Sequence, residues 1–169
     1  MEKLLFSGAS GFLGHNVVPI LSKQYDITTI GITRHDNIKA NIAQEVPSLL
    51  EKYDVILHAA GKAHVYPKNQ EEIQSFYDVN YEGTVNICKA LEKVGLPKSF
   101  IFISTLDVYG LAVGECIDET YPKNPKTHYA ISKLKAEEFL IDWAKERGVI
   151  LGILRPSLMI GPNPPGNLK

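Results

Sequence analysis

Tyr129 and Lys133 are four positions apart in a segment with helical periodicity, so both side chains lie on one face of the expected helix. A phenol near its ordinary pKa of about 10 is a poor proton donor or acceptor at neutral pH. A neighbouring ammonium group favours the phenolate, and we therefore expect Lys133 to lower the pKa of Tyr129 toward neutrality. The YxxxK spacing is common by chance, and an exposed tyrosine beside a solvated lysine would produce the same pattern.

A hydroxyl side chain that could assist proton transfer is Thr105, which follows the apolar run 100–104. Such a run is typical of a strand buried in a parallel sheet. The carboxyl ends of parallel strands meet at one edge of the sheet, where ligands bind. Thr105 is therefore predicted at the ligand edge, where its hydroxyl could donate a hydrogen bond to a substrate oxygen.

Three glycines follow the first apolar run and open a helical segment. Glycines at a strand-to-helix turn permit a tight bend, close approach of the backbone to a pyrophosphate, and close helix–sheet packing. The phosphates would then meet N–H groups at the positive end of the helix. The spacing is GxxGxxG and not the GxGxxG dinucleotide fingerprint, and a purely structural turn is the alternative. The expected phosphate-binding residues are Gly8, Ser10, Gly11, Phe12, Leu13 and Gly14.

The end of the second predicted strand bears on the choice between NAD and NADP. An acidic residue there would bind the ribose 2′-hydroxyl, and a basic residue would accept a 2′-phosphate. Thr33 occupies the expected place, Arg34 is next to it, and Asp36 is expected to lie too far along. The pattern favours NADP slightly, although Arg34 as a solvated loop charge would leave the choice open.

Short apolar runs alternate with amphipathic segments along the chain, which is the pattern of a βαβα order. This order predicts an α/β fold, a Rossmann-like doubly wound parallel sheet whose strands are covered by helices on both faces. Gly148 is predicted to end the last helix as its C-cap. The expected strands are 4–7, 27–32, 55–58, 100–104 and 149–154, and the expected helices are 11–22, 42–52, 71–94 and 127–147.

The composition argues against several other classes of protein. The 169 residues carry a formal net charge of −1 with Lys and Glu interspersed, so there is no basic stripe for nucleic acid. No apolar run approaches the length of a membrane span. The histidines are scattered, and Cys88 and Cys116 form no metal-ligand pattern. We therefore expect no nucleic-acid, membrane or metal partner, and a reducing, cytoplasmic location.

Six motifs occur in order along the chain. They are the GxxGxxG turn, HAAG at 58–61, NYEGT at 80–84, STLDVYG at 104–110, YAISK at 129–133, and LRP at 154–156 with GP at 161–162. Together they resemble the extended short-chain dehydrogenase/reductases, the NAD-dependent epimerase/dehydratase family, over residues 4–167. The resemblance implies an NAD(P)-dependent enzyme that transfers hydride between nicotinamide and a carbon of a nucleotide-sugar, usually C4.

The resemblance also implies roles for individual residues. Thr105 matches the family's catalytic hydroxyl residue, Tyr129 its acid/base, and Lys133 the residue that lowers the tyrosine pKa and holds the nicotinamide ribose. Gly8, Gly11 and Gly14 match the phosphate turn. Asn41 stands where many relatives have an aspartate that contacts adenine. The other cofactor-binding positions that the resemblance implies are Ala59, Ala60, Gly61, Asn80 and Pro156.

Departures from the family pattern narrow the expected reaction. Sugar 4,6-dehydratases of the family carry an Asp-Glu pair directly after the catalytic threonine, whereas this chain has Leu106-Asp107. Without the first acid, elimination lacks its proton donor, which favours 4-epimerisation or reduction of a 4-keto sugar. The 64–66 segment, His-Val-Tyr, and the Gly-Pro…Gly-Asn ending are closest to polysaccharide-pathway enzymes that act on UDP-linked N-acetyl sugars.

The resemblance places an NAD(P)-binding domain at 1–155 and the start of a linker at 156–169, leading to a substrate domain outside these 169 residues. We therefore expect this chain to bind cofactor with little or no turnover by itself, and its two long helices offer surfaces for a homodimer. The alternative is a non-catalytic NAD(P)-binding regulatory or scaffold module. The intact set of Thr105, Tyr129 and Lys133 disfavours it, because a sensor has no use for an activated phenol.

Overall fold

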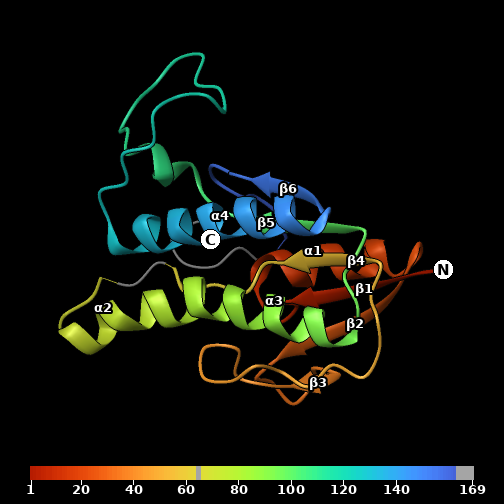
Figure 1. Cartoon of the computed structure of the whole chain (residues 1–169). Helices are drawn as coiled ribbons and strands as arrows, with labels where there is room; N and C mark the ends of the chain where they lie inside the picture. The colour runs from red at the N-terminus through yellow and green to blue at the C-terminus, as the bar shows by residue number, and fades with distance from the viewer. Residues whose placement is uncertain (64–65, 163–169) are drawn as a thin grey trace.

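A single parallel sheet forms the centre of the fold. The computed structural model describes residues 1–63 and 66–162. Six strands lie in the order β3-β2-β1-β4-β5-β6, and every pair of neighbours is parallel (Figure 1). This is the strand order of Rossmann-type dinucleotide-binding folds, so the doubly wound prediction is confirmed. The strands are β1 (Glu2–Ser7), β2 (Tyr25–Gly31), β3 (Ile38–Lys39), β4 (Val55–His58), β5 (Ser99–Ile103) and β6 (Ile150–Leu154).

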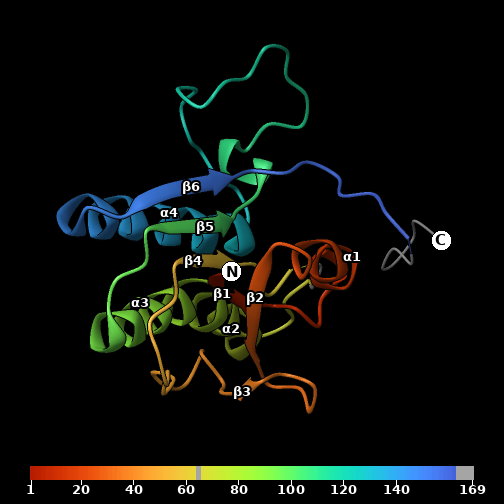
Figure 2. The same cartoon turned by 90° about the vertical axis from the view of Figure 1, so that its right-hand side faces the viewer.

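Helices connect the strands and cover the sheet. Helix α1 (Phe12–Leu21) joins β1 to β2, α3 (Gly83–Val94) leads into β5, and α4 (His128–Arg147) leads into β6. Helices α3 and α4 lie side by side over one face of the sheet, and α1 lies on the other (Figure 2). Right-handed crossovers that run in opposite directions from β1 place the helices in this way.

The core lies mainly between the sheet and the α3–α4 layer. Phe100 and Phe102 of β5 have no exposed area and pack with Ile87 of α3 and Leu140 of α4. Burying each such side chain contributes roughly 1.5–3 kcal/mol. Residues of β5 that point to the other face, such as Ile101, are only partly buried. The expectation of strands covered on both faces therefore holds for β5 on the α3–α4 side alone in the described structure.

The predicted helix at 42–52 is wrong. The segment is a turn followed by irregular chain, although Ile42, Leu49 and Tyr53 are all buried in the core. Pro47 stands in the middle of the segment, where a helix would need its missing N–H and would clash with its ring. The spacing of the apolar residues therefore predicted their burial correctly but predicted a helix that does not form.

The predicted helix at 71–94 exists but contains an irregular turn. Helix α2 (Gln70–Tyr77) has Asn69 as its N-cap, and the Asn69 side chain accepts a hydrogen bond from the Glu72 N–H. It continues through the π-helical turn η1 (Asp78–Glu82) into α3. Insertions of this kind are frequent at functional sites.

Helix α4 follows the prediction closely at both ends. The Thr127 hydroxyl oxygen accepts the Ala130 N–H at 3.1 Å, which caps the first turn. Gly148 follows the helix with a φ of 67° and confirms the predicted C-cap, since this left-handed conformation favours glycine. The two-residue strand β3 and the short 3₁₀ helix η2 (Leu106–Tyr109) were not predicted.

Two of the sequence motifs lie partly outside the described residues. These are His64 and Val65 of the 64–66 segment, and the chain from Asn163 onward. Over the ranges 1–63 and 66–162, none of the helices combines the length and the apolar character needed to cross a bilayer. Across the same ranges, His, Cys, Asp and Glu side chains form no group of three that could hold a metal ion.

Candidate active site

The glycine turn is in direct contact with the segment that follows β4. Gly8 has a φ of 84°, and a Cβ on it would lie 2.5 Å from the Ala60 nitrogen and 2.7 Å from the Ala59 carbonyl carbon. Both the conformation and the space therefore require glycine. Gly11 stands at the N-cap of α1 and supplies no side-chain cap, so the first N–H groups of α1 have no side-chain acceptor from that position.

The backbone at Gly61 lies close to two of the predicted cofactor residues. A Cβ on Gly61 would lie 2.9 Å from the Lys133 Nζ and 3.1 Å from the Asn80 Oδ1. The Asn80 side chain is itself held in place, because its Oδ1 accepts the Lys62 N–H at 2.8 Å. Its Nδ2 donates to the Ser132 hydroxyl at 2.9 Å. Gly61, Asn80 and Lys133 therefore form one compact cluster at the carboxyl edge of the sheet.

Lys133 is a buried cation. Only 3% of it is exposed, its Nζ donates to the Ile103 carbonyl at 2.9 Å, and it lies 4.7 Å from the centre of the Phe102 ring. Burial lowers the pKa of Lys133 to about 8, against the opposing effect of the Glu137 carboxylate. A charge at this depth whose hydrogen bond goes to a backbone carbonyl is a functional-site signal.

The pKa of Tyr129 differs from the sequence-based expectation. Burial raises it, the Thr105 hydroxyl opposes the rise through a hydrogen bond, and the Asp107 carboxylate adds to it. The expected lowering by Lys133 is wrong for the chain as described, because the ammonium is directed to the Ile103 carbonyl. Thr105 and Tyr129 nevertheless lie together, as the prediction of a shared ligand edge requires.

Thr105 is positioned by the turn that follows β5. Its hydroxyl oxygen accepts the Asp107 N–H at 3.2 Å and caps η2. The Leu106 N–H donates to the Pro156 carbonyl at 3.3 Å, which brings the segment after β6 beside this turn. Leu106 is 41% exposed, so an apolar side chain stands where the family's dehydratases have their first acid.

A buried ion pair fixes these two segments on α4. Glu137 has no exposed area, and its two carboxylate oxygens accept from Arg155 at 3.0 and 2.7 Å. Glu137 also accepts the Ser104 hydroxyl, and Arg155 donates to the Tyr109 hydroxyl at 2.6 Å. The carboxylate therefore holds the ends of both β5 and β6. Sequence analysis assigned it no role, although its place four residues after Lys133 on one helix was a usable signal.

The predicted adenosine-side residues lie apart from this cluster, at the ends of β2 and β3. The Asp36 carboxylate accepts from the Thr33 N–H at 2.9 Å and from its hydroxyl at 2.7 Å. A Cβ on Gly31 would be 2.7 Å from this carboxylate, so Asp36 folds back to the end of β2, and its distance from a bound ribose stays a prediction. Arg34 is exposed and donates to His35 at 3.1 Å. Asn41 accepts the Ala43 N–H at 3.2 Å, which turns its side chain toward its own loop.

A hollow of about 420 Å³ lies against α1 and is lined by Phe12, His15, Asn16 and Pro162. The Asn16 amide donates to the Pro162 carbonyl at 3.3 Å across it. Phe12 is the one predicted cofactor residue in this lining, and neither Tyr129 nor Lys133 belongs to it. Among the described residues, the lining of the hollow therefore does not include the cluster of Gly61, Asn80 and Lys133.

Comparison of the sequence with known proteins identifies a family that matches nearly the whole chain. The model of the NAD dependent epimerase/dehydratase family matches residues 4–169. UDP-glucose 4-epimerase of Vibrio cholerae is 32% identical over 182 residues, which cover 98% of this chain and 54% of that protein. GDP-6-deoxy-D-mannose reductase of Pseudomonas aeruginosa is 28% identical, covering 95% of this chain and 53% of that protein. The chain spans about half the length of these curated relatives.

Among solved structures, RMD from Pseudomonas aeruginosa complexed with NADPH matches with a TM-score of 0.80 and 27% identity. The match covers 96% of this chain and 55% of that one.

Proposed function

Because the chain belongs to the NAD dependent epimerase/dehydratase family, we propose that it forms the dinucleotide-binding part of an enzyme that moves hydride between nicotinamide and a carbon of a nucleotide-sugar. The cluster of Gly61, Asn80 and Lys133 carries this proposal. A buried ammonium held against the bare backbone of Gly61 is an arrangement that allows close approach of a ribose. An ordinary structural lysine would be solvated, since burying an ammonium is costly.

The residues present fit a dinucleotide. The Gly8 turn has no room for side chains beside Ala59 and Ala60, so backbone could approach a pyrophosphate closely. The N-terminus of α1 would offer its N–H groups to the phosphates. Lys133 would hold the nicotinamide ribose. When bound, the nicotinamide supplies or accepts the hydride.

Tyr129 would carry the proton that accompanies hydride transfer, and Thr105 would hold the reacting oxygen by a hydrogen bond. Burial raises the pKa of Tyr129 and holds the proton on the phenol, so proton transfer to a keto oxygen would need the Lys133 charge to act on it more strongly than it does in this arrangement. With Leu106 in place of an acid, the site favours 4-keto reduction or 4-epimerisation over dehydration. The relative named UDP-glucose 4-epimerase supports a UDP-linked sugar as the substrate.

NADP is the proposed cofactor form. The Asp36 carboxylate accepts two hydrogen bonds from Thr33 through one oxygen, Oδ2, so it is turned toward its own loop. Arg34, two residues before it, is exposed and could accept a 2′-phosphate. The relative whose structure holds NADPH supports this choice.

Titration calorimetry of this chain with NADP⁺, NADPH and NAD⁺ tests the proposal. We expect micromolar binding with NADP forms preferred, and Arg34→Ala should weaken NADP binding about tenfold through loss of a charge-assisted contact. NAD⁺ binding should change less than about twofold in that variant, since it lacks the 2′-phosphate. A folded chain that binds none of the three would contradict the proposal.

Tyr129→Phe in the enzyme that contains the substrate-binding part separates catalysis from a regulatory role. It should leave dinucleotide affinity nearly unchanged and abolish turnover, because only the phenolic proton is removed. Unchanged turnover would remove Tyr129 from the chemistry and favour a non-catalytic module.

A further inference from the structure

His58 is a fully buried polar residue that the proposed chemistry does not use. It ends β4, has no exposed area, and lies 5.6 and 6.0 Å from the ring centres of Phe102 and Phe100. Burial lowers the pKa of His58 to about 3, with a smaller contribution from the Lys133 charge. The imidazole is therefore neutral at physiological pH, with one donor nitrogen and one acceptor nitrogen.

The hydrogen bonds around His58 have a fixed direction. The Thr84 hydroxyl donates to the Asn80 carbonyl at 2.7 Å, so toward the His58 Nε2, 3.0 Å away, it can only accept. Nε2 therefore carries the proton, and Nδ1 accepts from the Ser7 hydroxyl. The Ser7 oxygen in turn accepts the Ala60 N–H at 3.4 Å. These hydrogen bonds all point the same way, from the segment after β4 through Ser7 of β1 and the His58 imidazole to Thr84 of α3.

The last of these hydrogen bonds reaches Asn80 in the irregular turn η1. Asn80 lies inside η1, where the α-helical hydrogen-bond ladder is interrupted, and the Thr84 hydroxyl binds its carbonyl from one turn ahead. The side chain of the same residue bridges the Lys62 backbone and Ser132, beside Lys133. The imidazole thus connects the start of the glycine turn, at Ser7, with the asparagine that adjoins the buried ammonium.

We propose, on the basis of the function proposed above, that His58 is a positioning residue. It holds the η1 turn and the Asn80 side chain at a fixed position relative to the glycine turn that would bind the phosphates. An apolar side chain of similar size would fill the same space between Phe100 and Phe102. It would leave the Ser7 and Thr84 hydroxyls without their shared partner, and the two ends of the site would lose their connection.

The protonation state of the ring is the first test. In ¹⁵N NMR spectra of the chain at neutral pH, His58 should show the Nε2–H tautomer. The Nδ1–H tautomer, or a protonated ring, would overturn the direction of the hydrogen bonds and with it the proposal.

Variants of Thr84 provide the second test. Thr84→Val removes the hydroxyl with little change of shape, Thr84→Ser keeps it, and Cys88→Ala changes another buried side chain one turn along α3. The Asn80 side-chain amide should exchange its protons with solvent at least about tenfold faster in Thr84→Val, as expected for loss of the two buried hydrogen bonds that the Thr84 hydroxyl makes. Thr84→Ser and Cys88→Ala should retain the wild-type exchange rate. Equal exchange in Thr84→Val and wild type would overturn the proposal.

Dinucleotide affinity then connects the positioning role to the site. Thr84→Val should weaken NADP binding about fivefold, and Thr84→Ser should restore it, whereas a merely structural role would make Cys88→Ala equally harmful. If the wild type binds no dinucleotide, the proposed function fails, and the tautomer and the exchange rates still decide the role of His58.

Discussion

Helix α4 contributes to two Arg–Glu pairs that are alike in chemistry and different in environment. Glu137 binds Arg155 at 2.7 Å, and Arg147 binds Glu92 of α3 at 2.8 Å. Each guanidinium also lies over an aromatic ring, 5.1 Å from the centre of Tyr109 and 5.5 Å from that of Trp143. Glu137 is completely buried, whereas the Glu92 side chain is 37% exposed.

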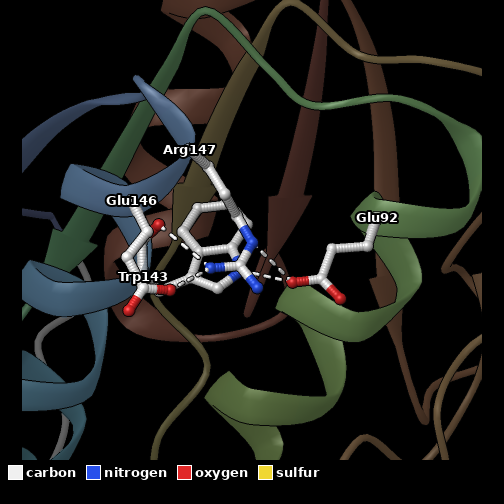
Figure 3. A network of polar contacts seen from close by, with 4 residues as sticks. All are labelled: Glu92, Trp143, Glu146 and Arg147. Carbon is white, nitrogen blue, oxygen red and sulfur yellow. Dashed lines mark hydrogen bonds and ion pairs between the residues drawn. The ribbon is translucent and has the colours of Figure 1, made fainter.

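The exposed pair joins two neighbouring helices. Glu92 also accepts the Trp143 Nε1–H at 2.8 Å, and Arg147 has a second carboxylate partner in Glu146 at 3.0 Å (Figure 3). Solvent can replace most of these contacts, so an exposed pair of this kind contributes little to stability.

The buried pair has a different task. Desolvation offsets much of the attraction between buried charges, so such a pair adds little stability compared with apolar packing. What it provides is geometry, since Glu137 holds Ser104, next to Thr105, and Arg155, next to Pro156. The same pair of residue types therefore joins two helices at the surface and, in the interior, fixes the ends of β5 and β6 on α4.

The largest effect is expected from breaking the buried pair. Glu137→Leu leaves the Arg155 charge buried without a partner and should lower the free energy of unfolding by about 3–5 kcal/mol. Urea denaturation measures this change. The double variant Glu137→Leu/Arg155→Met should recover at least half of the loss, because no unpaired charge remains. A loss below about 1 kcal/mol in the single variant would mean that the Glu137–Arg155 pair contributes no more to stability than an exposed ion pair, and would contradict the prediction.

Lys133 extends the comparison to a buried charge whose hydrogen-bond acceptor is a carbonyl. Its pKa is about 8 in the folded chain and 10.5 ordinarily. Between these pH values the unfolded chain holds the proton and the folded chain releases it, so stability rises with pH. From pH 8 to pH 10.5, wild type should gain about 3 kcal/mol relative to Lys133→Met in urea unfolding. Parallel curves for the two proteins would show that the pKa of Lys133 is the same in the folded and unfolded chain, and would contradict the lowered value.

The smallest effect is expected at the exposed pair. Arg147→Met keeps an apolar side chain against Trp143 and removes the charge, so the unfolding free energy should fall by about 1 kcal/mol or less. The difference should shrink in 1 M salt, where exposed charges are screened. Thermal or urea unfolding at both salt concentrations measures it. A salt-independent loss above about 2 kcal/mol would mean that the pair behaves as a buried one.

Sequence patterns were sufficient wherever the signal is local. The glycine turn, the Gly148 C-cap and the YxxxK face each depend on residues within about four positions, and the structure has them in place. The helix predicted at 42–52 failed because its apolar spacing reported burial of Ile42 and Leu49, and Pro47 excluded the helix.

The sequence by itself determined the doubly wound sheet, the family, and the edge at which Thr105, Tyr129 and Lys133 meet. Only the tertiary structure decided which way Lys133 points and why the pKa of Tyr129 rises. It alone joined His58 to Thr84, 26 residues away, and Ser104 to Glu137, 33 residues away. The physical reason is that neighbouring residues determine where helices and turns begin and end. Burial, charge pairing and pKa values depend instead on groups that only folding brings together.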